Sequence, residues 1–81
     1  MNRADVLTKL QTVFDDLFLE PVKVTAELSA DDVDEWDSLL HVSLVVAVEK
    51  AFGVRFRVGE VEATKNVGDL ADLIVRRVEG R

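Results

Sequence analysis

Apolar side chains recur every three or four residues in three separate segments, and this spacing constrains the fold more than any other feature of the chain. In the first segment one helical face carries Val6, Leu7, Leu10, Val13, Phe14, Leu17 and Phe18. A second helix is expected from Asp37 or Ser38 to Phe52. The face of the third carries Val67, Leu70, Ala71, Ile74 and Val78. The pattern predicts an all-α fold.

Capping residues stand where each helix should begin or end. Asn2 with Asp5, and Asn66 with Asp69, have the three-residue spacing of an N-cap and its N3 partner. Gly53 suits the left-handed position that follows a helix. The sequence therefore predicts where the three main helices lie along the chain.

The connecting segments differ in length. Residues 19–37 show no sustained period and Pro21 prevents continuation of the first helix, so a long loop is expected, with one short turn at Ser29 and Asp32. Residues 54–58 alternate like a strand but lack a partner strand, and are expected to be extended. Residues 59–64 are a candidate for one helical turn. The prediction is a single domain over residues 1–81, a small four-helix bundle of three main helices plus one short helix.

Composition excludes several classes of function. The chain has no cysteine and a single histidine, so neither a disulfide framework nor a metal centre is expected. Sixteen acidic against ten basic residues give a net charge of −6, which disfavours nucleic acid and anionic membranes as partners. No segment reaches the ~18 apolar residues of a membrane span. A monomer in the cytoplasm is expected.

The helix expected at residues 38–52 has apolar side chains on two opposite sides. At 100° per residue, the side facing the core carries Leu40, Leu44, Val45, Val48, Ala51 and Phe52. The opposite side carries Leu39, Val42 and Val46. These three aliphatic side chains either form a surface on which a partner docks or pack beneath one of the connecting segments.

Ser38 follows five carboxylates within residues 31–37. His41 lies one helical turn away, but a serine hydrolase also needs an orienting third group, an oxyanion hole and a nucleophile elbow, and the sequence offers none of these. A calcium loop is excluded because Trp36 stands at a ligand position and Asp37 where the turn needs glycine. Capping by Asp37 or Ser38 explains the position of the serine only in part.

The motif "DSL" at residues 37–39, followed by "VEKAFGVRF" at 48–56 and "NVGDLADLI" at 66–74, resembles the acyl carrier proteins over almost the whole chain. The resemblance implies that a phosphopantetheinyl transferase attaches 4′-phosphopantetheine from coenzyme A to Ser38. It implies a carrier, not an enzyme, which holds an acyl intermediate as a thioester and presents it to acyl-loading, acyl-transfer or condensing enzymes. It also implies that partners recognise Asp37, Leu39, Val42, Val46 and Glu49.

Two features depart from the usual pattern of that family. Trp36 stands where many carriers have glycine, and Ser43 and Lys50 stand on the outer face of the helix where carriers of general fatty-acid synthesis usually have acids. These departures favour a dedicated carrier of polyketide, natural-product or specialised lipid biosynthesis. An aminoacyl or peptidyl carrier and an unmodified helical interaction module are the alternatives. For the acidic run, stabilisation by Mg²⁺ or Ca²⁺ and an ordinary solvated loop both remain open.

Overall fold

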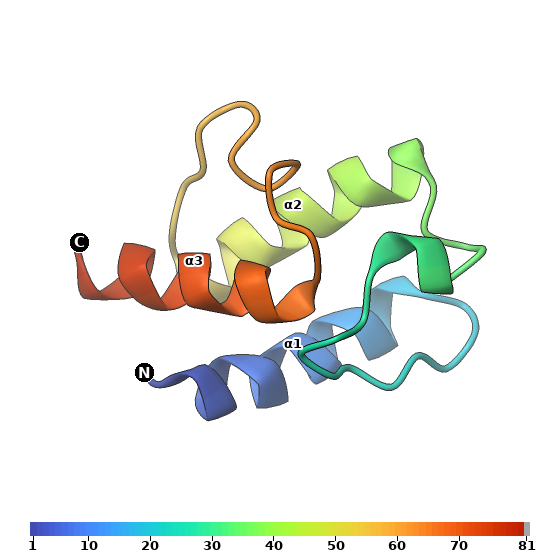
Figure 1. Cartoon of the computed structure of the whole chain (residues 1–81), viewed down its shortest axis with the longest axis horizontal. Helices are drawn as coiled ribbons and strands as arrows, with labels where there is room; N and C mark the ends of the chain where they lie inside the picture. The colour runs from blue at the N-terminus through green and yellow to red at the C-terminus, as the bar shows by residue number, and fades with distance from the viewer. Residues whose placement is uncertain (81) are drawn as a thin grey trace.

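Three α-helices and one short 3₁₀-helix, η1, make up the computed structural model, which describes residues 1–80 (Figure 1). Their bounds are Arg3–Leu17 for α1, Ala30–Asp32 for η1, Ser38–Phe52 for α2 and Val67–Glu79 for α3. Within residues 1–80 there is no strand. The predicted all-α class, with three main helices and one short helix, is confirmed.

The three helices begin at the predicted residues, and α2 also ends where predicted, whereas α1 ends at Leu17 and leaves Phe18 as its extended C-cap residue. The Asn2 side chain accepts a hydrogen bond from the N–H of Asp5 at 2.9 Å, and the Asn66 side chain accepts one from Asp69 at 2.8 Å. Gly53 follows α2 with a φ of 66°, in the left-handed region that favours glycine. Local sequence signals are sufficient to set these helix ends because each cap bonds within one turn of its own helix.

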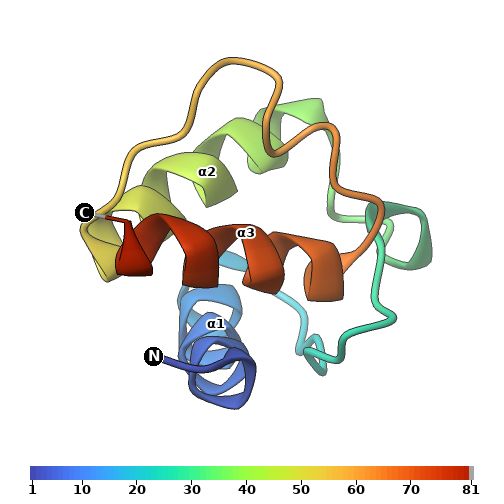
Figure 2. The same ribbon diagram turned by 60° about the vertical axis from the view of Figure 1, so that its left-hand side comes forward.

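The core lies where α1 contacts both α2 and α3 (Figure 2). Its buried members from these helices include Val6, Leu10, Phe14, Leu44, Val48, Leu70 and Ile74. At one end of the core Phe14 stacks on Phe18 with ring centroids 4.9 Å apart, and Trp36 meets both rings edge-on. Trp36 therefore anchors the end of the long loop, directly before α2, to α1.

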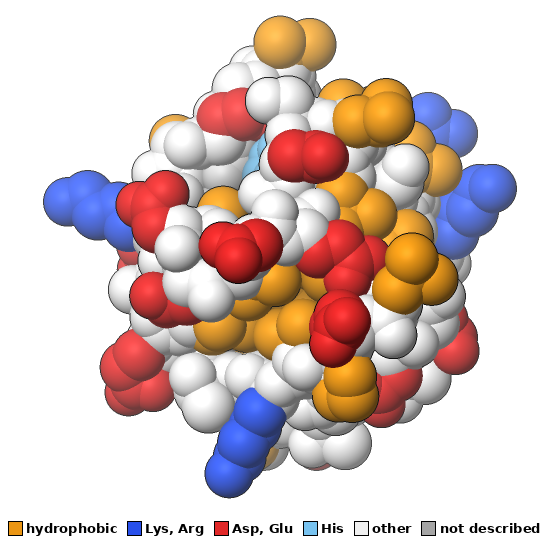
Figure 3. Space-filling view, turned by 90° about the vertical axis from the view of Figure 1, so that its right-hand side faces the viewer, with side chains coloured by type: hydrophobic (Ala, Val, Ile, Leu, Met, Phe, Trp, Pro, Cys, Tyr) orange, Lys and Arg blue, Asp and Glu red, His pale blue; other side chains and the backbone are white. Residues whose placement is uncertain are grey.

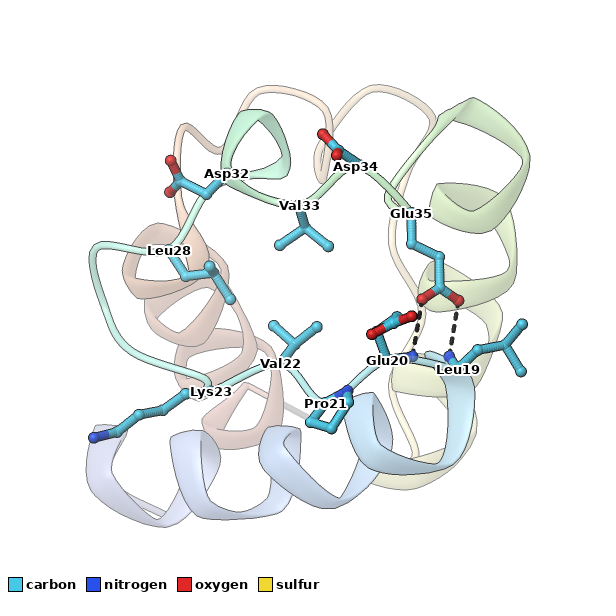
Figure 4. Close-up of a pocket in the computed structure, with 10 residues that line it drawn as sticks. All are labelled: Leu19, Glu20, Pro21, Val22, Lys23, Leu28, Asp32, Val33, Asp34 and Glu35. Atoms are coloured by element: carbon cyan, nitrogen blue, oxygen red, sulfur yellow. Dashed lines mark hydrogen bonds between the residues drawn. The ribbon is translucent and has the colours of Figure 1, made fainter.

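Polar contacts hold the long loop of residues 18–37 along its length. The Gln11 carboxamide donates to the carbonyl of Val22 at 2.8 Å and accepts from the N–H of Val24 at 2.9 Å. The carboxylate of Glu35 accepts from the N–H groups of Leu19 and Glu20, at 2.8 and 3.1 Å (Figure 4). These contacts close the loop on itself and on α1.

The loop also contacts the start of α3. The N–H groups of Val67 and Gly68 donate to the carbonyls of Leu28 and Ala26, both at 2.8 Å. A Cβ on Gly68 would lie 2.9 Å from the Ala26 carbonyl oxygen, so glycine permits this close approach. Two of the N–H groups that a helix start leaves unpaired are thereby satisfied by a distant segment.

Residues 58–63 form a run of turns and not a helix. A single bond of the α-helical type joins the N–H of Ala63 to the carbonyl of Gly59 at 3.1 Å. Of the helical turn expected at residues 59–64, one α-helical hydrogen bond is present. The short helix of the fold is instead η1, in the long loop. Residues 54–57 form neither helix nor strand, with Val54 buried and Phe56 half-buried, whereas Val58, expected to continue the extended segment, is the first residue of the turns.

Candidate functional site

Ser38 is the first residue of α2, and it is exposed. Asp37 caps the helix, because its carboxylate accepts a hydrogen bond from the N–H of Leu40 at 2.8 Å. Within residues 1–80 the N–H groups of Ser38 and Leu39 have no hydrogen-bond partner. N–H groups at a helix start carry partial positive charge, so an anion attached to the Ser38 hydroxyl would be stabilised there.

Both ring nitrogens of His41 face residues other than Ser38. Nδ1 accepts a hydrogen bond from Nε1 of Trp36 at 3.1 Å, and Nε2 lies 3.4 Å from Oε1 of Glu62. No hydrogen bond joins His41 to Ser38 in the described part of the chain. The arrangement therefore gives the serine no general base of the kind that nucleophilic catalysis requires.

The outer face of α2 is apolar and open to solvent. Leu39 is 78% exposed, Val42 62% and Val46 44%, whereas Leu44 and Val48 on the opposite side are buried. The angular analysis of the sequence therefore assigned both sides of the helix correctly. Of the two roles left open for these aliphatic side chains, the structure excludes burial beneath a connecting segment.

The outer face of α2 continues into a groove of about 510 Å³, whose second wall is the segment after α2. Val42 and Val46 line it from the helix, and Phe56 and Val58 line it from the segment, with Val58 fully exposed. The carboxylate of Glu49 accepts the N–H of Phe56 at 2.9 Å, so this predicted recognition residue also ties the two walls together. The three- and four-residue spacing of apolar side chains within α2 could not predict the second wall, because that wall belongs to the segment after the helix.

Glu60 fixes the far end of that second wall. Its carboxylate accepts a hydrogen bond from the N–H of Arg57 at 2.6 Å and pairs with the guanidinium of Arg77 in α3. The Arg57 N–H, followed by the Arg77 charge, holds the pKa of Glu60 below its usual range, although burial acts in the opposite direction. The second wall of the groove is therefore attached to α2 through Glu49 and to α3 through Arg77.

Three of the five carboxylates before Ser38 have structural partners. Asp32 accepts the N–H of Ser29 at 3.0 Å, Glu35 bridges two N–H groups at the end of α1, and Asp37 caps α2. Asp31 and Asp34 are exposed and have no hydrogen bond in the described structure. Across residues 1–80 no three or more His, Cys, Asp or Glu side chains are grouped so that they could hold a metal ion.

Residues 35–74, which include Asp37, Ser38 and α2, match the family model described as the phosphopantetheine attachment site. Over nearly its full length the chain is 39% identical to an acyl carrier protein of Thermosynechococcus vestitus, with 96% of this chain and 98% of that protein aligned. The chain belongs to the acyl carrier protein family. The resemblance seen in its motifs is confirmed, and the members of this family are carriers and not enzymes.

Other relatives agree with this assignment. An acyl carrier protein of Acidothermus cellulolyticus is 37% identical over 75 residues, which cover 91% of this chain and 89% of that one. The solution structure of the holo acyl carrier protein from Geobacter metallireducens superposes with a TM-score of 0.75 at 38% identity, covering 96% of this chain and 86% of that one. The holo form of that relative and the matched attachment site confirm 4′-phosphopantetheine as the prosthetic group of the family.

The surroundings of Ser38 fit this prosthetic group. Its hydroxyl is exposed, and the two free N–H groups beside it suit a phosphodiester. The arm supplies the thiol that forms the thioester, and this chain has no cysteine of its own. None of the helices in residues 1–80 has the length and apolar character needed to cross a membrane.

Proposed function

We propose that Ser38 carries 4′-phosphopantetheine and that the chain, as one carrier domain, presents an acyl thioester on this arm to partner enzymes. The observation that carries the proposal is the position of Ser38. It is the exposed first residue of α2, and its neighbour Asp37 performs the capping that would otherwise occupy a serine hydroxyl. A transferase can therefore modify Ser38 without breaking a bond that holds the fold.

In this function the residues of the chain bind the phosphodiester and form the surface that partner enzymes contact. The free N–H groups of Ser38 and Leu39 stabilise the phosphodiester charge. Asp37 and the exposed side chains Leu39, Val42 and Val46 form the face that the transferase and the acyl-handling enzymes contact, with Glu49 at its edge. Apolar contact area supports such an interface more than charge does, because the outer side of α2 also carries Ser43 and Lys50.

The composition of α2 also supports a dedicated carrier over one of general fatty-acid synthesis. Basic partners are attracted by acids along the docking helix, and here Ser43 and Lys50 weaken that attraction. We place the carrier in polyketide, natural-product or specialised lipid biosynthesis, as a monomer in the cytoplasm. Partner enzymes in such a pathway would select it through the apolar face.

The test is the mass of the protein after incubation with coenzyme A and a broad-specificity phosphopantetheinyl transferase. Wild type and Ser43→Ala, which alters an exposed serine on the same helix, should both gain one phosphopantetheinyl group. Ser38→Ala should gain none, and should stay folded, because it loses less than the ~1 kcal/mol typical of a removed N-cap. A wild type that gains no mass would instead support an unmodified interaction module.

A further inference from the structure

Residues 50–59, at the end of α2 and directly after it, are basic in a chain that is acidic as a whole. They include Lys50, Arg55 and Arg57 and no Asp or Glu, whereas the whole chain has sixteen acidic residues and a net charge of −6. Figure 1 shows this end of α2 on the opposite side of the molecule from the long loop, which carries most of the carboxylates before Ser38. Positive charge is therefore concentrated at the end of α2 that lies away from Ser38.

A hollow of about 570 Å³ lies at this end of the helix. Its lining, which we call the basic hollow, consists of Val46, Glu49 and Lys50 from α2 and Gly53, Val54 and Arg55 from the segment that follows. Val46, which is 44% exposed, and Glu49 also line the groove on the outer face of α2. The basic hollow therefore continues the surface proposed for docking.

The two basic side chains of the hollow are unpaired. Lys50 and Arg55 are exposed, and within residues 1–80 neither side chain makes a hydrogen bond or an ion pair. The carboxylate in the lining belongs to Glu49, which is half-buried and accepts the N–H of Phe56 at 2.9 Å. Two free positive charges beside one engaged negative charge leave the basic hollow positive.

We propose that the basic hollow binds an acidic side chain of a partner enzyme, an Asp or Glu whose apolar neighbours in the partner rest on Val46 and Val54. This inference rests on the proposed function, because it extends the surface proposed there for docking. The carboxylate complements the charges of Lys50 and Arg55, and the apolar neighbours complement the two valines. Such a partner segment is opposite in charge to the basic segments that the carboxylates near Ser38 attract.

The net charge of the chain does not prevent this contact, because the acidic end is distant. Lys50 comes 13 residues after Asp37, which at 1.5 Å per residue separates them by about 20 Å along the helix axis. Exposed charges at physiological ionic strength are largely screened beyond about 8 Å. The C-terminal end of α2 itself carries about half a negative charge, which is smaller than the two side-chain charges.

Opposite charges at the two ends of α2 fix the direction in which a partner lies along the helix. A partner with basic residues opposite Asp37 and an acidic residue opposite Lys50 and Arg55 fits in one orientation, since the reverse orientation brings like charges together. The arm on Ser38 then meets the same part of each such partner. A nucleic acid or an anionic membrane does not fit this pattern, because an extended polyanion also meets the acidic end.

The test uses two short peptides with blocked ends, Leu-Glu-Glu-Leu and Leu-Gln-Gln-Leu, which differ in charge and hardly in size. Each is titrated into the unmodified protein at low salt and followed by NMR. We expect the acidic peptide to bind at least about threefold more tightly, the effect of two exposed ion pairs, and to move the amide signals of Lys50, Val54 and Arg55. NaCl should reduce the difference. Equal binding, or movement confined to signals elsewhere, would overturn the inference.

Paired substitutions assign the preference to the basic hollow. The double variant Lys50→Gln with Arg55→Gln should bind the two peptides equally. The control, Lys23→Gln with Lys65→Gln, removes the same charge from exposed side chains elsewhere and should keep the preference. A preference that survives in the first variant, or that disappears in the control, would show that the basic hollow does not bind the carboxylate. The peptide comparison on wild type stands without either variant.

Transfer kinetics connect the binding to function. With the acyl-transfer enzymes that use the loaded protein, Lys50→Glu with Arg55→Glu should raise KM at least about threefold and leave kcat within about twofold, because both residues are remote from the thioester. Unchanged KM values with every such enzyme would overturn the role of the hollow in docking.

The peptide titration also separates this inference from the proposed function. It needs no arm, so a preference for the acidic peptide in Ser38→Ala would support the basic hollow even if Ser38 accepted no prosthetic group. Modification of Ser38 in a protein that binds both peptides equally would overturn this inference and leave the proposed function intact.

Discussion

At the scale of single residues, Asp37 and Ser38 have separate roles although both are residue types that cap helices. Asp37 accepts the N–H of Leu40, which leaves the Ser38 hydroxyl exposed and without a structural bond. From the sequence alone either residue could be the N-cap of α2, because they are adjacent and both are residue types that cap helices. Only the backbone conformation distinguishes them, because Asp37 is extended and Ser38 is already helical.

Gln11 holds the long loop through a side chain that the sequence pattern did not single out. Gln11→Ala should remove the bonds to Val22 and Val24 and lower the free energy of unfolding by about 1–2 kcal/mol, because both backbone groups are partly buried. Urea unfolding measures this loss of stability. The amide hydrogen of Val24 should also exchange with solvent faster than in wild type. Thr8→Ala, on the exposed side of α1, is the control and should change stability by less than about 0.5 kcal/mol. An equal effect of both substitutions would contradict the role of Gln11.

Glu60 makes stability depend on pH. Its pKa in the folded protein lies below the value of 4.5 for a free side chain, so its contribution is complete above pH 4.5 and is lost as pH falls through the lower, folded pKa. Glu60→Gln should therefore be less stable than wild type at pH 7, with a difference that shrinks in acid. Denaturant melts from pH 7 to pH 3 measure it, with the exposed Glu27→Gln as control. A difference that is constant with pH would show that neither the Arg57 N–H nor the Arg77 guanidinium stabilises the charged form of Glu60.

At the scale of elements, the helices follow from the sequence because their signals are local. Each N-cap bonds three residues along the chain, and each apolar face repeats within one or two turns. The contacts that position these helices are not local. The bonds from Val67 and Gly68 to the long loop and from Trp36 to His41 join separate segments, and no spacing rule predicts them. The turns at residues 58–63 also depend on a distant residue, Arg77, which pairs with Glu60.

The two sides of α2 make opposite predictions for the same substitution. Val46→Asp places a charge on the exposed side and should change the free energy of unfolding by less than about 1 kcal/mol. Val48→Asp places it among buried apolar side chains and should cost several kcal/mol, enough to unfold a domain of this size. Circular dichroism melts of both variants measure the contrast.

Val46→Asp should lose function although it keeps its fold. Folded Val46→Asp should be modified by the transferase, or acylated by partner enzymes, at least ten times more slowly, because an unpaired charge at the centre of an interface opposes docking. Val58→Asp tests whether the second wall of the groove belongs to the same surface. Wild-type rates for Val46→Asp in every transfer reaction would remove the docking role of this face.

At the scale of the whole molecule, negative charge gathers at the end formed by the long loop. Figure 3 shows Asp and Glu side chains surrounding apolar atoms on this end of the molecule. Val22, Leu28 and Val33 line a hollow there together with Asp32, Asp34 and Glu35. The loop is therefore held by apolar and backbone contacts against the repulsion of its own carboxylates, in a chain whose net charge is −6.

This balance predicts how salts act on stability. NaCl should raise the melting temperature by screening the carboxylates, and MgCl₂ or CaCl₂ should raise it no further at matched ionic strength, because no group of three or more potential ligands in residues 1–80 could hold a metal ion. Asp34→Asn should raise the melting temperature at low salt, since Asp34 has no partner. Glu35→Gln should lower it, since Glu35 holds Leu19 and Glu20. A saturating rise with millimolar divalent ion, beyond that of NaCl, would instead establish a cation site in the acidic loop.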